Sequence, residues 1–273
     1  MEHEFKRKSL KELNLTSRFL FDAVMEDKEI HQDVLSIIFG RKISTIIQNE
    51  TEKEARLSPL IRSIRMDVFA LDDEQTVYNT EMQDEQRSDL ARRSRYYQAL
   101  LDTSLLEPGI PNYNVLNNSY IIVILSFDLF GYGKYQYTFL PQCQEVPGLQ
   151  LEDGATRIFL STEGKNGDEV SEELVEFLHY VKNSTDEVAA KSQSERVRRL
   201  HQRVCKVKAS EEVGVRYMQA WEERYYDREK GRSEGKLEGK LEDALNMRKE
   251  GLSDEMIMRI TKLTEEEMRK ITE

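Results

Sequence analysis

The chain has 273 residues, of which 38% are hydrophobic and 33% charged, and its formal net charge is −11. This composition is typical of a globular protein and excludes a disordered chain. The longest apolar stretch, YIIVILSFDLF, is too short to cross a bilayer, and the N-terminal MEHEFKRKSLKELNL lacks the apolar core of a signal peptide. We therefore expect a cytoplasmic protein without membrane association, in which Cys143 and Cys205 are reduced free thiols.

The first elements in chain order are a helix and then a β-hairpin. Apolar residues recur at helical spacing over 16–39, Thr16 or Ser17 can cap the start, and Gly40 can end the helix. A short strand is predicted near ISTIIQNE. Residues 64–71 and 77–83 then alternate in polarity, which predicts two strands of a hairpin.

The register of this hairpin decides whether its acidic residues meet. If the turn is Asp72 to Thr76, an odd number of residues, then odd positions pair with odd positions across the two strands. Asp67 then lies opposite Glu81, and Gln83 shares their face. A shift by one residue would separate them, because alternate side chains point to opposite faces.

The later elements complete a layered domain. A helix is predicted over Glu85 to Leu106, followed by a buried strand in NSYIIVILSFDLF and two shorter strands in KYQYTFLP and ATRIFLST. SEELVEFLHYV, residues 171–181, is a further amphipathic helix. This order predicts an α/β or α+β domain of about 180 residues.

The composition changes beyond this domain. We expect a core over 1–185, a charged helical extension over 186–230, a glycine-punctuated and loosely helical connector over 231–251, and a small helical tail over 252–273. In the tail, Ser253 is a predicted N-cap, and Thr264 with Glu267 forms a predicted capping box.

The chemistry that the hairpin predicts is the binding of a hard divalent cation. Two carboxylates on one face, Asp67 and Glu81, can bind Mg²⁺ with the backbone carbonyl of Met82. Gln83 can orient a water molecule or touch a phosphate oxygen. The alternative is structural: the acids lie on a solvated face, or Arg65 is the salt-bridge partner of Asp67. Asp22 and Glu26 can join the site, although surface positions are the simpler interpretation.

Basic residues follow the hairpin directly. Arg87, Arg92, Arg93 and Arg95 are candidates for contacts with DNA phosphates, or they form a solvated helix face. Tyr97 is most simply a packing residue. The net charge argues against broad non-specific binding of nucleic acid but is compatible with a local basic groove. The four histidines form no cluster in the sequence, which predicts no zinc site.

The hairpin motif, Asp67 followed after thirteen residues by Glu81-Met82-Gln83, resembles the catalytic motif of the PD-(D/E)XK nuclease superfamily. The wider chain is similar to its transposase-related branch, the recombination-promoting nucleases. The similarity extends through LTSRFLFDAVMEDKE, RMDVFALDD, YNTEMQ, RRSRYYQALLD, SYIIVILSFDLFGYGKYQYTF and GRSEGKLEGKLED, which together cover most of residues 13–242.

The resemblance implies a restriction-endonuclease-like mixed sheet flanked by helices and cleavage of DNA that depends on Mg²⁺, with Mn²⁺ as an alternative. Asp67 and Glu81 would be metal ligands, and Gln83 would take the place of the superfamily's lysine; Met66 stands where proline is common. We expect DNA as the substrate, a homodimer formed through the core or the helical extension, and a role in recombination, mobile elements or defence. The alternative is a catalytically silent scaffold that mediates assembly or protein binding.

Overall fold

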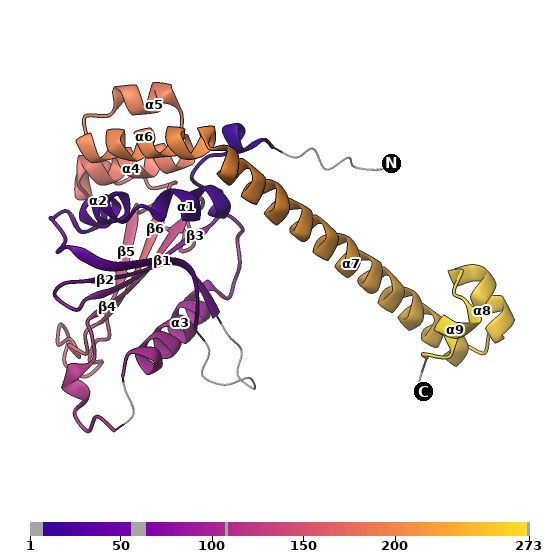
Figure 1. Cartoon of the computed structure of the whole chain (residues 1–273). Coiled ribbons are helices and arrows are strands. Elements are labelled where there is room, and N and C mark those ends of the chain that lie inside the picture. Colours follow the sequence, from indigo (N-terminus) through magenta and orange to yellow (C-terminus); the bar gives the residue numbers. More distant parts are fainter. Residues whose placement is uncertain (1–7, 56–63, 107–108, 272–273) are drawn as a thin grey trace. The chain divides into compact units, whose positions relative to one another are not determined.

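A computed structural model describes residues 8–55, 64–106 and 109–271 (Figure 1). The chain divides into two compact units, Met1–Gly214 and Val215–Glu273. The first unit therefore includes residues 186–214, which the change in composition assigns to a separate helical extension.

The first unit is built on a mixed sheet. Its order is β1-β2-β3-β4-β6-β5, six strands among the described residues. β1, β2 and β3 are antiparallel, β3, β4 and β6 are parallel, and β5 is antiparallel to β6. The bounds are β1 Ile46–Ala55, β2 Ile64–Asp72, β3 Val77–Gln83, β4 Ser119–Leu125, β5 Gln136–Phe139 and β6 Ala155–Ser161. The predicted strands are thus present, and the mixed α/β class is confirmed.

The predicted helix over 16–39 is two helices, α1 (Arg18–Met25) and α2 (Lys28–Phe39). The break has a local cause. Asp27 has an extended backbone, and its carboxylate accepts hydrogen bonds from the N–H groups of Glu29 and Ile30, so it caps the start of α2. The periodicity could not reveal this break because the apolar spacing continues across it. Gly40 ends α2 in the left-handed conformation, as predicted.

The hairpin has the predicted register. Phe69 lies opposite Asn79 and Leu71 opposite Val77, so odd positions pair with odd positions. The regular β2–β3 ladder runs as far as Val68 and Thr80. The next pair in the same register is Asp67 with Glu81, which places the two acids where the regular ladder ends.

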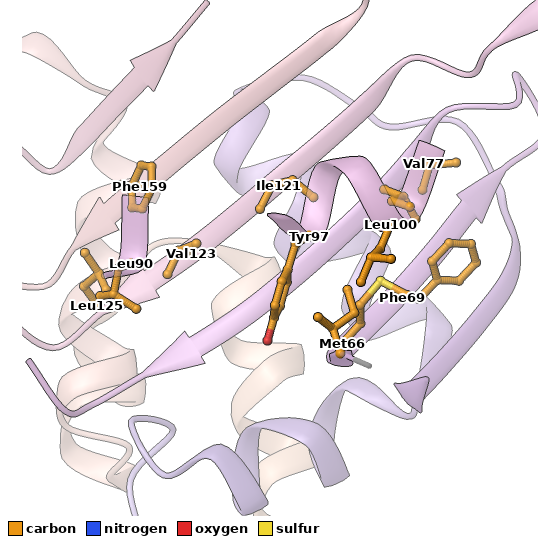
Figure 2. Packing of buried hydrophobic residues seen from close by; sticks show 12 residues of the cluster. Met66, Phe69, Val77, Leu90, Tyr97, Leu100, Ile121, Val123, Leu125 and Phe159 are labelled. Atoms are coloured by element: carbon orange, nitrogen blue, oxygen red, sulfur yellow. The ribbon is translucent and has the colours of Figure 1, made fainter. Parts of the chain in front are cut away.

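One face of the sheet is covered by α3 (Leu90–Leu105). This helix begins five residues later than predicted. Residues 84–89 form an ordered loop instead, in which the Gln83 amide donates to the Glu85 carbonyl and Arg87 pairs with Asp89. Figure 2 shows the packing of Leu90, Tyr97 and Leu100 from α3 on the sheet. Their partners in this core include Met66, Phe69, Val77, Ile121, Val123, Leu125 and Phe159.

Helices also cover the other face (Figure 1). α1 and α2 lie on the sheet, and α4 (Glu172–Lys182), α5 (Asp186–Lys191) and α6 (Glu195–Ala209) pack beyond them. The apolar stripe of α6, which resembles a coiled-coil seam in the sequence, is buried in this layer: Val197, Leu200, Val204 and Val207. The first unit thus has three layers: α3, the mixed sheet, and the helical layer formed by α1, α2, α4, α5 and α6.

The second unit contains most of α7 (Glu211–Lys249) together with α8 (Asp254–Thr261) and α9 (Glu265–Met268). The EGKL repeat, predicted to be loosely helical, lies in regular helix. Ser253 caps α8, and Thr264 with Glu267 forms the predicted capping box of α9. A small core joins the three helices through Ala244, Ile257, Leu263 and Met268.

Short 3₁₀ helices also occur in the chain: η1 (Leu10–Glu12), η2 (Tyr113–Val115) and η3 (Gly167–Glu169). Across the described part of the chain, every helix is either too short or too polar to span a membrane.

Candidate active site at the β2–β3 hairpin

Asp67 and Glu81 meet at the end of the β2–β3 ladder, both deeply buried, with 1% and 4% of their surface exposed. Glu81 Oε1 accepts a hydrogen bond from the Asp67 N–H at 3.1 Å. Asp67 Oδ2 accepts one from the Met82 N–H, also at 3.1 Å. Each carboxylate therefore binds a backbone donor of the opposite strand. This exchange fixes the two acids beside each other.

Two arginines face the acids from the two helical layers. Arg18, the first residue of α1, places Nη2 2.5 Å from Asp67 Oδ1. Arg93 of α3 places Nη2 3.0 Å from Glu81 Oε2. Arg65, the alternative partner of Asp67 considered from the sequence, pairs with Glu52 on the surface instead. The site therefore combines two buried carboxylates with two guanidinium groups that partly neutralise them.

A third carboxylate reaches the same place from α1. Asp22 is buried, and its Oδ2 lies 3.5 Å from Nε of Arg18, one helical turn away. The structure thus corrects the expected surface position of Asp22. The i,i+4 spacing of Arg18 and Asp22 in the sequence predicts that they pair on the helix, but not that they approach the hairpin. Glu26, the other acid considered, is exposed.

Burial dominates the electrostatics of these acids. It raises the pKa of Asp67, of Glu81 and of Asp22 above their ordinary values, because a buried carboxylate loses its hydration. The charge of Asp67 raises the pKa of Asp22 and of Glu81 further, whereas Arg18 and Arg93 oppose these shifts. An additional cation at this place would therefore relieve repulsion between the acids.

Gln83 and Tyr97 are tied to the acids through Arg93. Arg93 donates from Nη1 to Gln83 Oε1 at 3.2 Å and from Nε to the Tyr97 hydroxyl at 2.9 Å. Its guanidinium also lies over the Tyr97 ring, 5.0 Å from the centroid. Tyr97 is therefore both a core residue and a contact of the site. A small cavity adjoins this group, lined by Glu81, Gln83, Leu90, Arg93, Ser94, Tyr97, Ile121 and Val123.

The Met82 carbonyl, predicted to be a metal ligand, faces the β2 side of β3. The Met82 N–H donates to Asp67, and in a strand the N–H and C=O of one residue point the same way. The Gln83 carbonyl correspondingly points the other way and accepts from the N–H of Ser126. The backbone thus turns the Met82 oxygen toward the strand that carries Asp67.

The structure separates the four arginines proposed for DNA contact. Arg93 contacts Glu81 and Gln83. Arg87 pairs with Asp89 in the loop before α3, and Arg92 and Arg95 are exposed on α3. The sequence patterns do not identify Arg18 as a partner of the site, nor Asn79, whose amide donates to Glu81 Oε1 at 3.2 Å.

The sequence model of a family described as PD-(D/E)XK nuclease family transposase matches residues 17–234. The matched range includes α1, the hairpin and α3, and so every contact of the site described above. Comparisons with curated proteins and with solved structures gave no significant match.

Proposed function

The chain belongs to the PD-(D/E)XK nuclease family of transposases, and we propose that it is a DNA endonuclease that uses Mg²⁺, or Mn²⁺, to hydrolyse phosphodiester bonds. Membership supports a nuclease-like or transposase-related role, and nucleases of this kind generally use divalent metals. The observation that carries the proposal is the pair of buried carboxylates, Asp67 and Glu81, brought together from neighbouring strands.

The donor atoms of the site fit a hard divalent cation. Carboxylate and carbonyl oxygens are the ligands that Mg²⁺ prefers. Among the described residues, the buried Asp22 Oδ1 has no hydrogen-bond donor, and the buried Asp67 Oδ1 contacts Arg18 without the geometry of a hydrogen bond. The unsatisfied oxygen of Asp22 is costly unless a cation approaches it, and the Asp67 oxygen already accepts a cation in the form of Arg18. Asp67, Glu81 and the Met82 carbonyl would therefore hold the ion, which supplies Lewis acidity toward water and a phosphoryl oxygen.

The surrounding side chains have distinct tasks in this proposal. Gln83 orients the attacking water or a phosphate oxygen with its amide, since it cannot act as a strong base. Arg93 holds Gln83 and Glu81 in place through Nη1 and Nη2. Arg18 neutralises Asp67 and Asp22 when no metal is bound, and its side chain, 40% exposed, has room to leave.

DNA would reach the site along α3. Of the four proposed phosphate contacts, Arg92 and Arg95 are exposed on α3 and suit this role. Arg87 and Arg93 pair with Asp89 and Glu81 and would reach phosphate only after leaving these partners. Cleavage of both strands by a domain with one site needs two copies, so we include a homodimer in the proposal. Recombination, mobile-element biology or defence is the proposed setting.

Calorimetric titration of Mg²⁺ and Mn²⁺, run beside a plasmid-nicking assay, tests the proposal. Wild type should bind the ion and nick DNA, and Asp67→Ala and Glu81→Ala should do neither while remaining folded by circular dichroism. Asp73→Ala is the matched control, because Asp73 is an exposed acid in the turn of the same hairpin. Nicking at the wild-type rate by both site variants would remove the proposed site.

The second candidate is a silent scaffold. Gln83 in place of lysine, the net charge of −11, and the neutralisation of the acids by Arg18 and Arg93 favour it. Under this alternative, wild type neither binds Mg²⁺ nor nicks DNA. Binding without nicking would instead support the metal site and indicate a missing substrate or activator.

A further inference from the structure

A second group of metal-ligating side chains lies in the helical layer, on elements other than the hairpin. Asp186 begins α5, and His201 and Cys205 are one turn apart on α6. One ligand atom from each of the three lies within 4.8 Å of the others. His201 Nε2 is 3.2 Å from Asp186 Oδ1 and 3.5 Å from Cys205 Sγ. The i,i+4 spacing of His201 and Cys205 was visible in the sequence, but the approach of Asp186 depends on the fold.

The arrangement differs from a Cys-His-Asp catalytic triad. In a triad the carboxylate binds one ring nitrogen and the nucleophile the other. Here the nearest ring nitrogen to both the carboxylate and the thiol is Nε2. A single proton on Nε2 can form a hydrogen bond to either the carboxylate or the thiol, whereas a cation placed among the three atoms can bind the nitrogen, the oxygen and the sulfur at once.

The other ring nitrogen has its own partner. His201 Nδ1 lies 2.8 Å from the hydroxyl of Tyr180, a fully buried residue of α4. A neutral phenol oxygen can accept a hydrogen bond from Nδ1–H at this distance. That tautomer leaves the lone pair of Nε2 available for a metal. Orientation of a ligating histidine through its second nitrogen is a usual feature of metal sites.

The separations suit a small tetrahedral ion. With bonds of about 2.0 Å to nitrogen or oxygen and about 2.3 Å to sulfur, tetrahedral ligands lie about 3.3 to 3.5 Å apart. The two measured separations, 3.2 and 3.5 Å, match these edges. Cys205 Sγ is also 4.0 Å from Nδ1, so it lies over the ring, and a rotation about its Cα–Cβ bond is needed to direct it at the ion. Cys205 and Asp186 are both exposed, which leaves room for this adjustment.

We propose that Asp186, His201 and Cys205 bind a borderline divalent transition-metal ion of the Zn²⁺ class, with the fourth position open to water. Binding displaces the thiol proton of Cys205 to solvent, so a thiolate and a carboxylate together balance the two charges of the ion. The bound ion cross-links the first residue of α5 to α6. This site is independent of the proposed nuclease function, since it shares no residue with the hairpin.

Titration of Co²⁺ into the reduced full-length protein tests the site, because a Co²⁺–thiolate bond gives a charge-transfer band in the near ultraviolet. Carboxylates of the hairpin cannot produce this band. Wild type should develop it with one equivalent of Co²⁺ and lose it when Zn²⁺ is added. Cys205→Ser should abolish the band, and Cys143→Ser, which removes the other cysteine, should leave it unchanged.

Further variants test the other ligands and the orienting contact. His201→Gln and Asp186→Asn should each weaken Co²⁺ binding. Tyr180→Phe should weaken it by about 10- to 100-fold while the band keeps its position, as expected for an orienting partner. Absence of the band in wild type, its persistence in Cys205→Ser, or unchanged affinity in His201→Gln would each overturn the proposal. Far-ultraviolet circular dichroism of each variant separates loss of binding from loss of fold.

Discussion

Arg18 of α1 forms an ion pair with the buried carboxylate of Asp67 of β2, with 2.5 Å between Nη2 and Oδ1. The arginine also lies beside Asp22, on the same helix. Its positive group thus occupies the part of the site that the proposal gives to a divalent cation. Metal and guanidinium are therefore expected to compete for the same carboxylates.

Arg18→Ala should increase affinity for Mg²⁺ and lower the stability of the metal-free protein. Removal of the guanidinium leaves Asp67 and Asp22 without their cation, at a cost of about 1–3 kcal/mol in the free energy of unfolding. Addition of Mg²⁺ should restore much of this loss, because a ligand that binds only the folded state stabilises it. Urea unfolding with and without Mg²⁺ measures both effects. Arg65→Ala, at an exposed arginine that pairs with Glu52, is the control and should change neither quantity appreciably.

The raised pKa values of the site acids predict that the metal-free protein loses stability as the pH rises. A carboxyl group with a higher pKa in the folded state keeps a proton that the unfolded chain releases. Its contribution is complete below about pH 4, the ordinary carboxyl pKa, and is lost as the pH rises through the folded value. Since burial raises the pKa of Asp67 to about 6, that of Glu81 to about 8 and that of Asp22 to about 9, unfolding free energies should fall from about pH 4 to about pH 9.

Asp67→Asn tests this assignment. The variant cannot ionise at position 67, and the repulsion that raises the pKa of Glu81 also disappears, so the slope of stability against pH should flatten. Each pKa unit removed corresponds to about 1.4 kcal/mol. Asp73→Asn, in the exposed turn, should keep the wild-type slope. Equal slopes in wild type and Asp67→Asn would show that the buried acids are not responsible.

The hairpin was predictable because its information is local. The alternation of polar and apolar residues indicated the two strands, and the odd length of the turn set their pairing. The sequence alone could therefore bring Asp67 and Glu81 close together, one position beyond the regular ladder. The role of Arg18 was not predictable in this way. Its approach to Asp67 depends on how α1 packs on the sheet, and hydrophobic periodicity contains no information about that angle.

The predicted helix boundaries were wrong where hydrogen bonds of a polar side chain, rather than the apolar spacing, determine where a helix begins. The carboxylate of Asp27 starts α2 within a pattern that predicts one helix, and the loop from 84 to 89 delays α3 through side-chain contacts of Gln83 and Arg87. The burial of α6 could not be predicted from its own pattern. Its apolar seam, Val197, Leu200, Val204 and Val207, fits either a coiled coil or a packed layer, and only the neighbouring helices decide between them.

The burial of His31 should contribute a loss of stability as the pH falls, opposite in sign to the contribution of the site acids. It is fully buried, with Nδ1 2.7 Å from Asn49 Oδ1 and Nε2 3.1 Å from Thr80 Oγ1, and so joins α2 to β1 and β3. Burial lowers the pKa of His31 to about 4. Between about pH 6.5 and pH 4, His31 therefore binds a proton in the unfolded chain but not in the folded protein. This difference lowers the free energy of unfolding by up to about 3 kcal/mol. The site acids change the stability in the opposite direction over this range, so the loss is measured as the difference between wild type and His31→Gln in chemical unfolding at about pH 7 and about pH 4.5.

His31→Gln removes the titrating group, so its change in stability from about pH 7 to about pH 4.5 should be more favourable than that of wild type. Its stability at neutral pH should be lower because the hydrogen bonds of His31 to Asn49 and Thr80 are altered. His179→Gln, at an exposed histidine of α4, is the matched control and should keep the wild-type dependence. An unchanged pH dependence in His31→Gln would show that His31 does not make this contribution.

Gln83→Ala separates metal binding from water positioning. The Gln83 amide contacts Arg93 and the Glu85 carbonyl, whereas the proposed ligands are Asp67, Glu81 and the Met82 carbonyl. The variant should therefore bind Mg²⁺ within about twofold of wild type but nick plasmid DNA at least about 10-fold more slowly, because positioned proton-transfer and orienting groups contribute that much or more. Gln202→Ala, at an exposed glutamine of α6, should leave both unchanged. A parallel loss of Mg²⁺ affinity in Gln83→Ala would place Gln83 among the groups that hold the ion, and an unchanged nicking rate would remove it from the reaction.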